Sequence, residues 1–442
     1  MISLVGCGSD DNDDEVVEDV VVVSKAMVQV VHASPDAPKV NLIFDGGSIA
    51  DGVDYKQATG LIEIDAGEHT AEVKAILADG STIDAFDAVT ADFSADTIFS
   101  VLAVNNTAMI EPLILTRSDS EISSGNLRIQ IVHAAPGAPM VDVYATAPGA
   151  DLADSAPLVT ASFKDSLDAT EVPEGDYQIR ITAAGDSSAV VFDSGTLALA
   201  AGTDLLLAAV ENTGPGAQPV NLLAIDSMGA TEILDTATPA WLRVVHASAD
   251  APAVDVVVND GFGAPLVSNL AFGEFAGYVE VAGADYNTKV VPTGEETPAV
   301  IEADLSLVAG TSYQVIAANE LAMIEPLVIT ANNRKIATEA KLRVIHGSPT
   351  AQDVDIYLVA PGADITDLSP TLSSVLFLAD TDFLSISPES YDVIVTAAGS
   401  KDAAIGPLTV SLDALGIYTI IATDGAGGGG PLSVILLDDF VN

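Results

Sequence analysis

Short runs in which apolar and polar residues alternate recur along the whole chain. Clear examples are residues 177–182 (YQIRIT), 254–258 (VDVVV) and 391–396 (YDVIVT). A period of two with many β-branched residues is typical of a half-buried β-strand. Gly- and Asp-containing turn signals, such as residues 79–81 (DGS), separate the runs. No long amphipathic helix is evident, so the chain is predicted to be all-β.

One segment with this pattern occurs four times. It reads LRVVHASADAPAVDVVV from residue 242, and similar segments begin at Val28, Leu127 and Leu342. Each copy holds one histidine that is followed nine residues later by Asn or Asp; the four pairs are His32 and Asn41, His133 and Asp142, His246 and Asp255, and His346 and Asp355. Successive histidines are 101, 113 and 100 residues apart. This spacing indicates a tandem array of similar domains.

The repeats predict four domains after a leading segment over residues 1–25. The predicted domains span residues 26–118, 126–236, 240–333 and 340–440. About seven short strands in about 100 residues favour an antiparallel β-sandwich of the immunoglobulin or fibronectin kind. Cys7 is the single cysteine, so each domain is expected to rely on apolar packing between its sheets. The joints are short and polar, and the domains are expected to be articulated like beads on a string.

The charge balance excludes two classes of partner. Lys and Arg number 15 and Asp and Glu number 64, which gives a net charge of -49. Such a polyanion repels nucleic acid and anionic membrane surfaces. The acids are expected to form a solubilising surface in salty water, while Ca²⁺ binding by clustered carboxylates stays open as an alternative. No other cofactor is expected, and acids break every long apolar stretch, so no segment is predicted to span a bilayer.

The first residues suggest a lipid anchor. Residues 4–7 read LVGC, which resembles the lipobox of bacterial lipoproteins, and the resemblance implies that Cys7 is the lipid attachment site. Only six residues precede Cys7, too few for a secretory signal, so the signal is expected to be truncated here, with the natural start upstream. The acidic run over residues 10–15 is expected to remain extended as a tether.

The repeated signature itself is similar to that of the bacterial and archaeal "domain of unknown function 4397" proteins. The resemblance rests on the four histidine-bearing segments and covers nearly the whole chain after residue 26. It implies an exported, often lipid-anchored protein with the domain in tandem, and it implies no biochemical activity. Copy four departs most from the pattern, because Gly347 replaces an alanine and Gln352 replaces the second proline.

The repeated histidine has two interpretations. If the segment folds back as a hairpin, the imidazole could bond to the Asn or Asp nine residues later, which would form a structural latch. The alternative is a metal or acid–base site. One histidine per domain cannot assemble the three or four ligands that zinc requires, so the latch is favoured and no metal ligand is predicted. His69 belongs to no repeat and is expected to face solvent.

No catalytic residue is predicted. The chain has no GxSxG, HExxH, CxxC or P-loop motif. The favoured function is a non-enzymatic structural, adhesive or ligand-binding module of the cell envelope, lipid-anchored at the outer membrane or cell surface. Its partner would be an extracellular protein or polymer, with membrane contact only through the anchor. The alternative is an exported hydrolase whose site lies in strand-end loops.

Overall fold

The computed structural model describes residues 24–441 and contains four β-sandwich domains, each built from two sheets. The predicted all-β tandem fold is confirmed. The alternating runs form strands where expected, since residues 254–258 are β19 and the runs at 177–182 and 391–396 lie in β13 and β30. In residues 24–441 the helices are three-residue 3-10 turns, η1 (Thr107–Met109), η2 (Leu152–Asp154) and η3 (Leu321–Met323). None of these helices is long or apolar enough to cross a bilayer.

Domain one sets the plan for the other three. Its strands are β1 (Lys25–His32), β2 (Val40–Phe44), β3 (Gly47–Val53), β4 (Ile62–Asp65), β5 (Gly67–Ile76), β6 (Thr82–Phe93), β7 (Thr97–Val104) and β8 (Glu111–Ser118). One sheet has the order β4-β1-β7-β8 and the other the order β3-β2-β5-β6. The histidine strand β1 lies parallel to β7, with His32 opposite Ala103.

Domain two repeats this plan with one extra strand at an edge. Its strands are β9 (Asn126–His133), β10 (Val141–Thr146), β11 (Val159–Ala161), β12 (Ser166–Pro173), β13 (Gly175–Ala183), β14 (Val190–Leu199), β15 (Asp204–Glu211), β16 (Val220–Ile225) and β17 (Ala230–Ile233). The sheets have the orders β12-β9-β15-β16-β17 and β11-β10-β13-β14. The histidine strand β9 again lies parallel to the strand before the last hairpin, β15.

Domains three and four have eight strands each. Those of domain three are β18 (Ala240–His246), β19 (Val254–Val258), β20 (Val267–Leu270), β21 (Val279–Val281), β22 (Asp285–Pro292), β23 (Ile301–Ser306), β24 (Ser312–Ala318) and β25 (Glu325–Ala331). Those of domain four are β26 (Ala340–His346), β27 (Val354–Val359), β28 (Leu372–Val375), β29 (Leu384–Ile386), β30 (Ser390–Ala397), β31 (Ala403–Ser411), β32 (Ile417–Thr423) and β33 (Ser433–Asp438). Each domain therefore has eight or nine strands, against the expected seven, because seven of the sheets have four strands and that of domain two with β17 has five.

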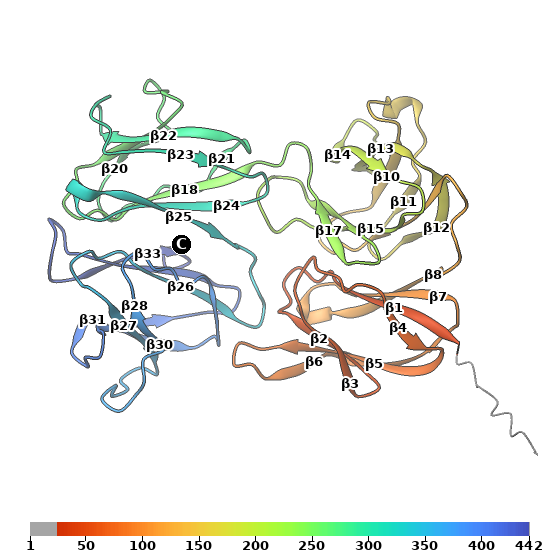
Figure 1. The fold of residues 1–442 in the computed structure, drawn as a ribbon, viewed down its shortest axis with the longest axis horizontal. Coiled ribbons are helices and arrows are strands. Elements are labelled where there is room, and N and C mark those ends of the chain that lie inside the picture. Colours follow the sequence, from red (N-terminus) through yellow and green to blue (C-terminus); the bar gives the residue numbers. More distant parts are fainter. Residues whose placement is uncertain (1–23, 442) are drawn as a thin grey trace, which may run out of the picture.

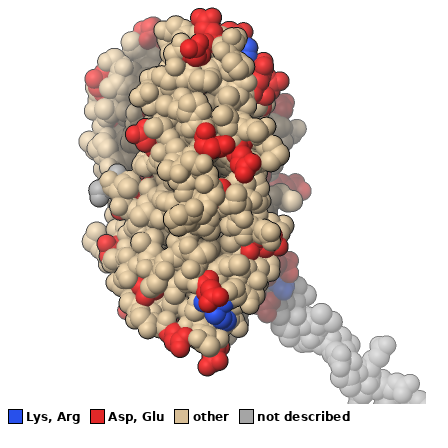
Figure 2. Space-filling model, turned by 90° about the vertical axis from the view of Figure 1, so that its left-hand side faces the viewer, with Lys and Arg blue, Asp and Glu red and all other residues tan. Residues whose placement is uncertain are grey.

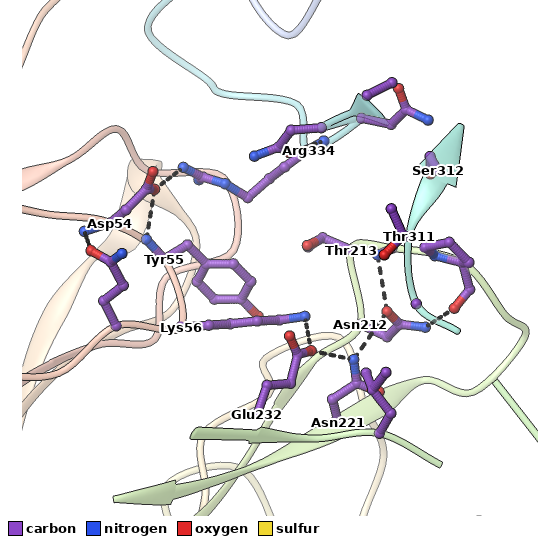
Figure 3. Close-up of a pocket in the computed structure, with 18 residues that line it drawn as sticks. Asp54, Tyr55, Lys56, Asn212, Thr213, Asn221, Glu232, Thr311, Ser312 and Arg334 are labelled. Atoms are coloured by element: carbon purple, nitrogen blue, oxygen red, sulfur yellow. Dashed lines mark hydrogen bonds and ion pairs between the residues drawn. The ribbon is translucent and has the colours of Figure 1, made fainter. Parts of the chain in front are cut away.

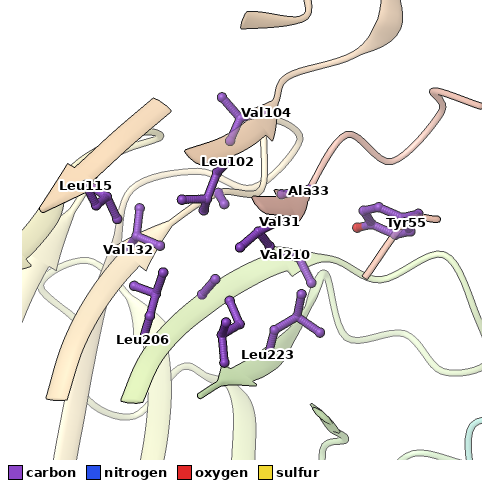
Figure 4. Close-up of a cluster of buried hydrophobic side chains, with 13 residues drawn as sticks. Val31, Ala33, Tyr55, Leu102, Val104, Leu115, Val132, Leu206, Val210 and Leu223 are labelled. Atoms are coloured by element: carbon purple, nitrogen blue, oxygen red, sulfur yellow. The ribbon is translucent and has the colours of Figure 1, made fainter. Parts of the chain in front are cut away.

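The domains pack in pairs, with domain two beside domain one and domain three beside domain four (Figure 1). In each pair the sheets that carry the histidine strands face one another. The first interface joins Val31 and Leu102 of domain one to Val132 and Leu206 of domain two (Figure 4). The second joins residues of β18 and β24 to residues of β26 and β32. The domains are therefore not articulated like beads on a string, as was expected. Buried apolar clusters join the two domains of each pair in addition to the short joints.

This pairing explains why the histidine strands are buried on both faces. Val30 of β1 packs inside domain one, whereas its neighbour Val31 packs against domain two. The polar residue three positions before each histidine is also buried; the four are Gln29, Gln130, Arg243 and Arg343. The first three bond to the neighbouring domain, whereas Arg343 pairs with Asp380 of its own domain. The half-buried pattern expected from period two therefore does not hold for these strands.

Many acidic side chains lie at the surface, although several charged residues, such as Arg243 and Asp255, are buried. Figure 2 shows acidic side chains scattered over the side of the molecule that lies at the left of Figure 1, with few basic ones among them. Scattered like charges are solvated individually and repel one another only weakly in salt. This distribution agrees with a solubilising surface.

Candidate binding cleft at the domain junction

A polar cleft of about 390 Å³ lies where domains one, two and three meet (Figure 3). We call it the junction cleft. Its lining comes from residues 54–57 of domain one, residues 212–215, Asn221 and Glu232 of domain two, and Leu234 in the joint that follows. Residues 310–312 of domain three and residues 331–334, at the end of β25 and after it, complete the lining. Its volume lies within the range of small-molecule sites.

Tyr55 is placed in the cleft by the turn between β3 and β4. The amide of Lys56 donates to the carbonyl of His32 (2.9 Å), and the amide of His32 donates to the carbonyl of Gln57 (3.0 Å). These bonds hold the turn on the end of the histidine strand. The Tyr55 hydroxyl then donates across the domain boundary to the carbonyl of Glu211 (2.6 Å). Burial raises the pKa of Tyr55 well above its ordinary value, so this hydroxyl keeps its proton.

Arg334 closes the cleft from the joint between domains three and four. Its Nη2 lies 2.6 Å from Asp54 Oδ1, and its Nη1 donates to the carbonyl of Ala37 (2.7 Å). The guanidinium lies over the Tyr55 ring, with 5.5 Å between its Cζ and the ring centroid. The side chain is only 6% exposed. A residue of the second domain pair therefore binds directly to the first domain.

The remaining charges of the cleft are also paired across a boundary. Lys56 Nζ lies 2.5 Å from Glu232 Oε1, and Asn221 Nδ2 donates to the same oxygen (2.6 Å). The Asn221 amide oxygen is buried and has no hydrogen-bond partner among the described residues. The cleft thus offers neutral polar groups to a ligand, since its charged groups already have partners.

The structure corrects the predicted histidine–aspartate latch. In every repeat the histidine Nε2 contacts the backbone carbonyl six residues later, at Pro38 (2.9 Å), Pro139 (3.1 Å), Pro252 (3.0 Å) and Gln352 (2.5 Å). Nδ1 accepts from the backbone amide two residues later, as from Ser34 to His32 (3.3 Å). The histidine therefore stabilises the turn without a bond to the Asn or Asp nine residues later. The same amide-to-Nδ1 bond is present at all four histidines, His32, His133, His246 and His346.

The Asn and Asp partners lie in the other sheet and bind elsewhere. Asp255 accepts from the backbone amides of Asn269 (2.7 Å) and Gly294 (3.0 Å). Asp355 accepts from Ser374 and Gly399 in the same way, Asp142 accepts from Thr160 Oγ1 and the Gly185 amide, and Asn41 accepts from Gly52. The hairpin geometry fails because the histidine strand and the next strand belong to different sheets. Val254 and Val256 pack in the core, so Asp255 between them points to the outer face of its sheet, away from the histidine strand.

Burial sets the protonation of two of these histidines. Desolvation lowers the pKa of His32 to about 4 and also lowers the pKa of His246. With Nδ1 accepting and Nε2 facing a carbonyl, the neutral ring that donates from Nε2 satisfies both partners. These rings are therefore neutral near pH 7 and have no free nitrogen for a substrate.

One partner of the histidine was missed at the sequence level. An aromatic ring stands edge-on to each imidazole; the four are Tyr55, Phe163, Phe272 and Phe377, with centroids 6.1, 6.4, 6.4 and 6.2 Å away. The aromatic follows the histidine at a variable distance in the sequence, so no fixed spacing marks it. Its recurrence after every histidine was the available signal.

His69 is half-buried at the surface: its Nδ1 lies 2.5 Å from Asp45 Oδ2, its ring centroid lies 4.8 Å from that of Phe44, and 16% of the side chain is exposed. Cys7 and the acidic run over residues 10–15 lie outside the described residues. Within residues 24–441 no group of three or more His, Cys, Asp or Glu side chains is placed to hold a metal ion.

Comparisons with known proteins identify a family more clearly than a function. A family model described as "Domain of unknown function (DUF4397)" matches residues 26–144 and 240–357. No curated protein sequence matches the chain. Among solved structures, the TIE protein of Bacillus anthracis is 11% identical, covering 91% of this chain and 68% of its own, with a TM-score of 0.15.

Two further structures are similar at the same level. A family 41 carbohydrate-binding module from streptococcal virulence factors is 10% identical, covering 41% of this chain and 93% of its own, with a TM-score of 0.17. A Ca²⁺-stabilised ice-binding adhesin of an Antarctic bacterium is 12% identical, covering 90% and 99%, with a TM-score of 0.10. These values are too low to carry an argument about function.

Proposed function

Because the chain belongs to the domain of unknown function 4397 family, whose model matches more than half of it, we propose that it is a non-enzymatic, exported module of the cell envelope. In this proposal all four sandwiches are copies of the family domain, and Cys7 carries a lipid anchor at the outer membrane or cell surface. The role is structural, adhesive or ligand-binding, toward an extracellular protein or polymer. The membrane is contacted only through the lipid.

One observation carries the non-enzymatic part of the proposal. The histidine is the only residue with acid–base chemistry near neutral pH that recurs in every repeat, and in each domain both of its ring nitrogens have backbone partners. A general base needs a free nitrogen within hydrogen-bond distance of its substrate. The repeated segment therefore supports a structural use of the histidine.

The pairing of the domains supports a presenting or binding role. Two extended apolar interfaces join the domains into pairs, and Arg334 joins one pair to the other. Such an assembly holds the strand-end loops of several domains at fixed positions, which is the arrangement that a binding surface requires. The junction cleft is one place where three domains contribute to a common concavity.

Turnover assays test the non-enzymatic assignment. Purified protein is incubated with generic ester, peptide and glycoside substrates, and we expect no turnover above a buffer control. Reproducible turnover that is lost when a strand-end loop is altered would favour an exported hydrolase instead.

Lipid labelling tests the anchor. Intact cells that express the protein are fed radioactive palmitate, and we expect label on the wild-type protein and on Ser9→Ala but not on Cys7→Ala. Equal labelling of the Cys7 variant, or an unlabelled wild-type protein, contradicts anchoring at this residue.

A further inference from the structure

The few basic residues of this chain are almost all paired with acids. All fifteen Lys and Arg side chains lie in the described part of the chain. Eleven of them have a carboxylate oxygen within 4.0 Å. The four that form no ion pair with a described residue are Lys39, Arg180, Lys341 and Lys401. Ion pairing is thus the rule among the basic residues of this chain of net charge -49, and these four are the exceptions.

Two of these four have other partners within their own domains. Arg180 Nη2 donates to Thr146 Oγ1 (3.0 Å) and to the Ala150 carbonyl (2.6 Å). Lys401 Nζ donates to Tyr357 Oη (2.9 Å) and lies 4.7 Å from the centroid of its ring. These contacts explain why the two side chains need no carboxylate.

The other two, Lys39 and Lys341, line one cleft. This cleft of about 420 Å³ lies between domain one, domain four and the joint before β26, and its lining shares Asp54, Asn332 and Arg334 with the junction cleft. We call it the lysine cleft. Lys39 comes from the loop before β2, whereas Lys341 lies on β26. Residues about 300 positions apart therefore bring their unpaired charges to one place.

Lys341 retains unused hydrogen-bonding capacity. Its side chain is buried, and the one hydrogen bond of its Nζ goes to the carbonyl of Asn332 (3.2 Å). An ammonium has three donors, so two are free. Burial, and then the nearby charge of Arg334, lower the pKa of Lys341 to about 8. An anion bound beside Lys341 would offset both the burial of its charge and the repulsion from Arg334.

The acids of the lysine cleft do not supply that anion. Asp54 is bound to Arg334 (2.6 Å), and Asp382 lies 3.0 Å from Arg343 Nη2. Glu339 accepts from Ser385 Oγ (2.9 Å), and burial raises its pKa. None of the three lies within the 4.0 Å ion-pair distance of Lys39 or Lys341, and both lysines remain available to an external ligand.

About half of the remaining lining residues are apolar, and these residues favour an anion that has an apolar body. Ile76 and Leu77 of domain one face the cleft together with Ile336 of the joint and Phe383 of domain four. The Lys341 Nζ lies 5.9 Å from the centroid of the Phe383 ring. An inorganic ion would leave these side chains without a contact, whereas a molecule with an apolar body would bury them.

We propose that the lysine cleft binds small organic carboxylates, with the carboxylate between Lys39 and Lys341 and the apolar body against Phe383, Ile336 and Leu77. This site extends the proposed binding role. It is tested on purified protein, so its outcome is independent of anchoring and of the turnover assays.

Titration calorimetry with the full chain tests the proposal, with benzoate as the probe and with benzyl alcohol and inorganic phosphate as comparisons. We expect saturable binding of benzoate, with benzyl alcohol and phosphate at least tenfold weaker. Removing one charge contact should weaken benzoate binding about tenfold, the equivalent of about 1.4 kcal/mol, in Lys341→Gln and in Lys39→Gln.

Lys335→Gln is the matched control, because Lys335 is exposed, is paired with Asp439 and does not line the cleft. It should bind benzoate like the wild type. Lys39 is exposed, so Lys39→Gln should fold even if the buried substitution Lys341→Gln prevents folding. The proposal is overturned if benzoate shows no saturable binding, if benzyl alcohol or phosphate binds as well as benzoate, or if Lys39→Gln binds it like the wild type.

Discussion

At the scale of single residues, the repeated histidine is a turn-holding group. In domain three, His246 Nε2 donates to the Pro252 carbonyl (3.0 Å), and Nδ1 accepts from the Ser248 amide (3.3 Å). The ring is fully buried beside Phe272. A buried group that connects two backbone positions stabilises the turn, because both positions would otherwise lack a partner in a region without water.

We therefore expect His246→Ala to lower the free energy of unfolding of domain three by about 1 to 3 kcal/mol, the cost of leaving buried partners unpaired. Hydrogen exchange of the β18 and β24 amides measures the change. Val308→Ala, at a side chain that is 62% exposed in the same domain, should change it by less than about 0.5 kcal/mol. A metal-dependent stabilisation of the wild type that disappears in His246→Ala would contradict the structural role.

The pKa values of the two histidines of domain one should be shifted in opposite directions. Burial lowers the pKa of His32 to about 4, whereas the bond to Asp45 raises the pKa of His69 above 6.5. The stability that His32 contributes is complete above its unfolded pKa of about 6.5 and is lost as the pH falls toward 4, by about 3 kcal/mol at 1.36 kcal/mol per pKa unit. The contribution of His69 is present below pH 6.5 and is lost as the pH rises through its folded pKa.

Proton NMR of the imidazole rings checks this expectation, with His32→Gln and His69→Gln for assignment. Between pH 8 and pH 6 the His69 resonance should move while that of His32 stays constant, because His32 remains neutral over this range. A His32 midpoint near 6.5 would show that its ring is solvated and would contradict the buried geometry.

At the scale of elements, the face of each histidine strand that points away from its own domain core determines how the domains associate. Val344 of β26 packs inside domain four, whereas Ile345 packs against Val245 and Ile316 of domain three. The strand beside it, β32, is buried along its whole length. Strands buried on both faces have continuous apolar runs, and the runs in β7, β15, β24 and β32 have this character.

Ile345→Ala should lower stability by about 2 to 4 kcal/mol, because it leaves a cavity between domains three and four. The matched change Ile83→Ala, at a side chain that is 47% exposed on the edge strand β6, should alter it by less than about 0.5 kcal/mol. Calorimetric melting of the full chain distinguishes the two. Equal melting temperatures for the two variants would mean that the domains do not pack on this face in solution.

At the scale of the whole molecule, Arg334 joins the two domain pairs. Its guanidinium binds Asp54 and the Ala37 carbonyl, and the amide of Ala337 donates to the carbonyl of Asp36 (2.8 Å). The chain as a whole carries -49, so the pairs repel one another at low ionic strength. The contact opposes that repulsion.

Arg334→Ala should therefore open the molecule and raise its radius of gyration, more at low salt than at high salt, because salt screens the repulsion. Small-angle X-ray scattering measures the change. Lys335→Ala, which removes an exposed cation next in sequence, is the control and should leave the radius of gyration unchanged. Wild-type dimensions for Arg334→Ala at low salt would show that other contacts hold the pairs together.

The all-β class and the fourfold repeat could be predicted from the sequence because they depend on local signals. Alternation of apolar and polar residues predicts strands, and the recurring histidine segment predicts equivalent domains. The partner of the histidine could not be predicted. After His246, Pro252 offers a carbonyl and Asp255 a carboxylate at similar distances along the chain. Which of the two the imidazole binds depends on the fact that β18 and β19 belong to different sheets.

The sequence by itself determined that this protein is a tandem array of sandwiches in which each repeat begins with the same histidine turn. Only the tertiary structure decided that the domains pack in pairs, that Arg334 binds domain one, and that Lys39 and Lys341 share a cleft. The physical reason is that strand formation depends on neighbours along the chain. Domain packing depends on complementary surfaces from residues up to about 300 positions apart, and the apolar pattern of a strand does not specify what covers its second face.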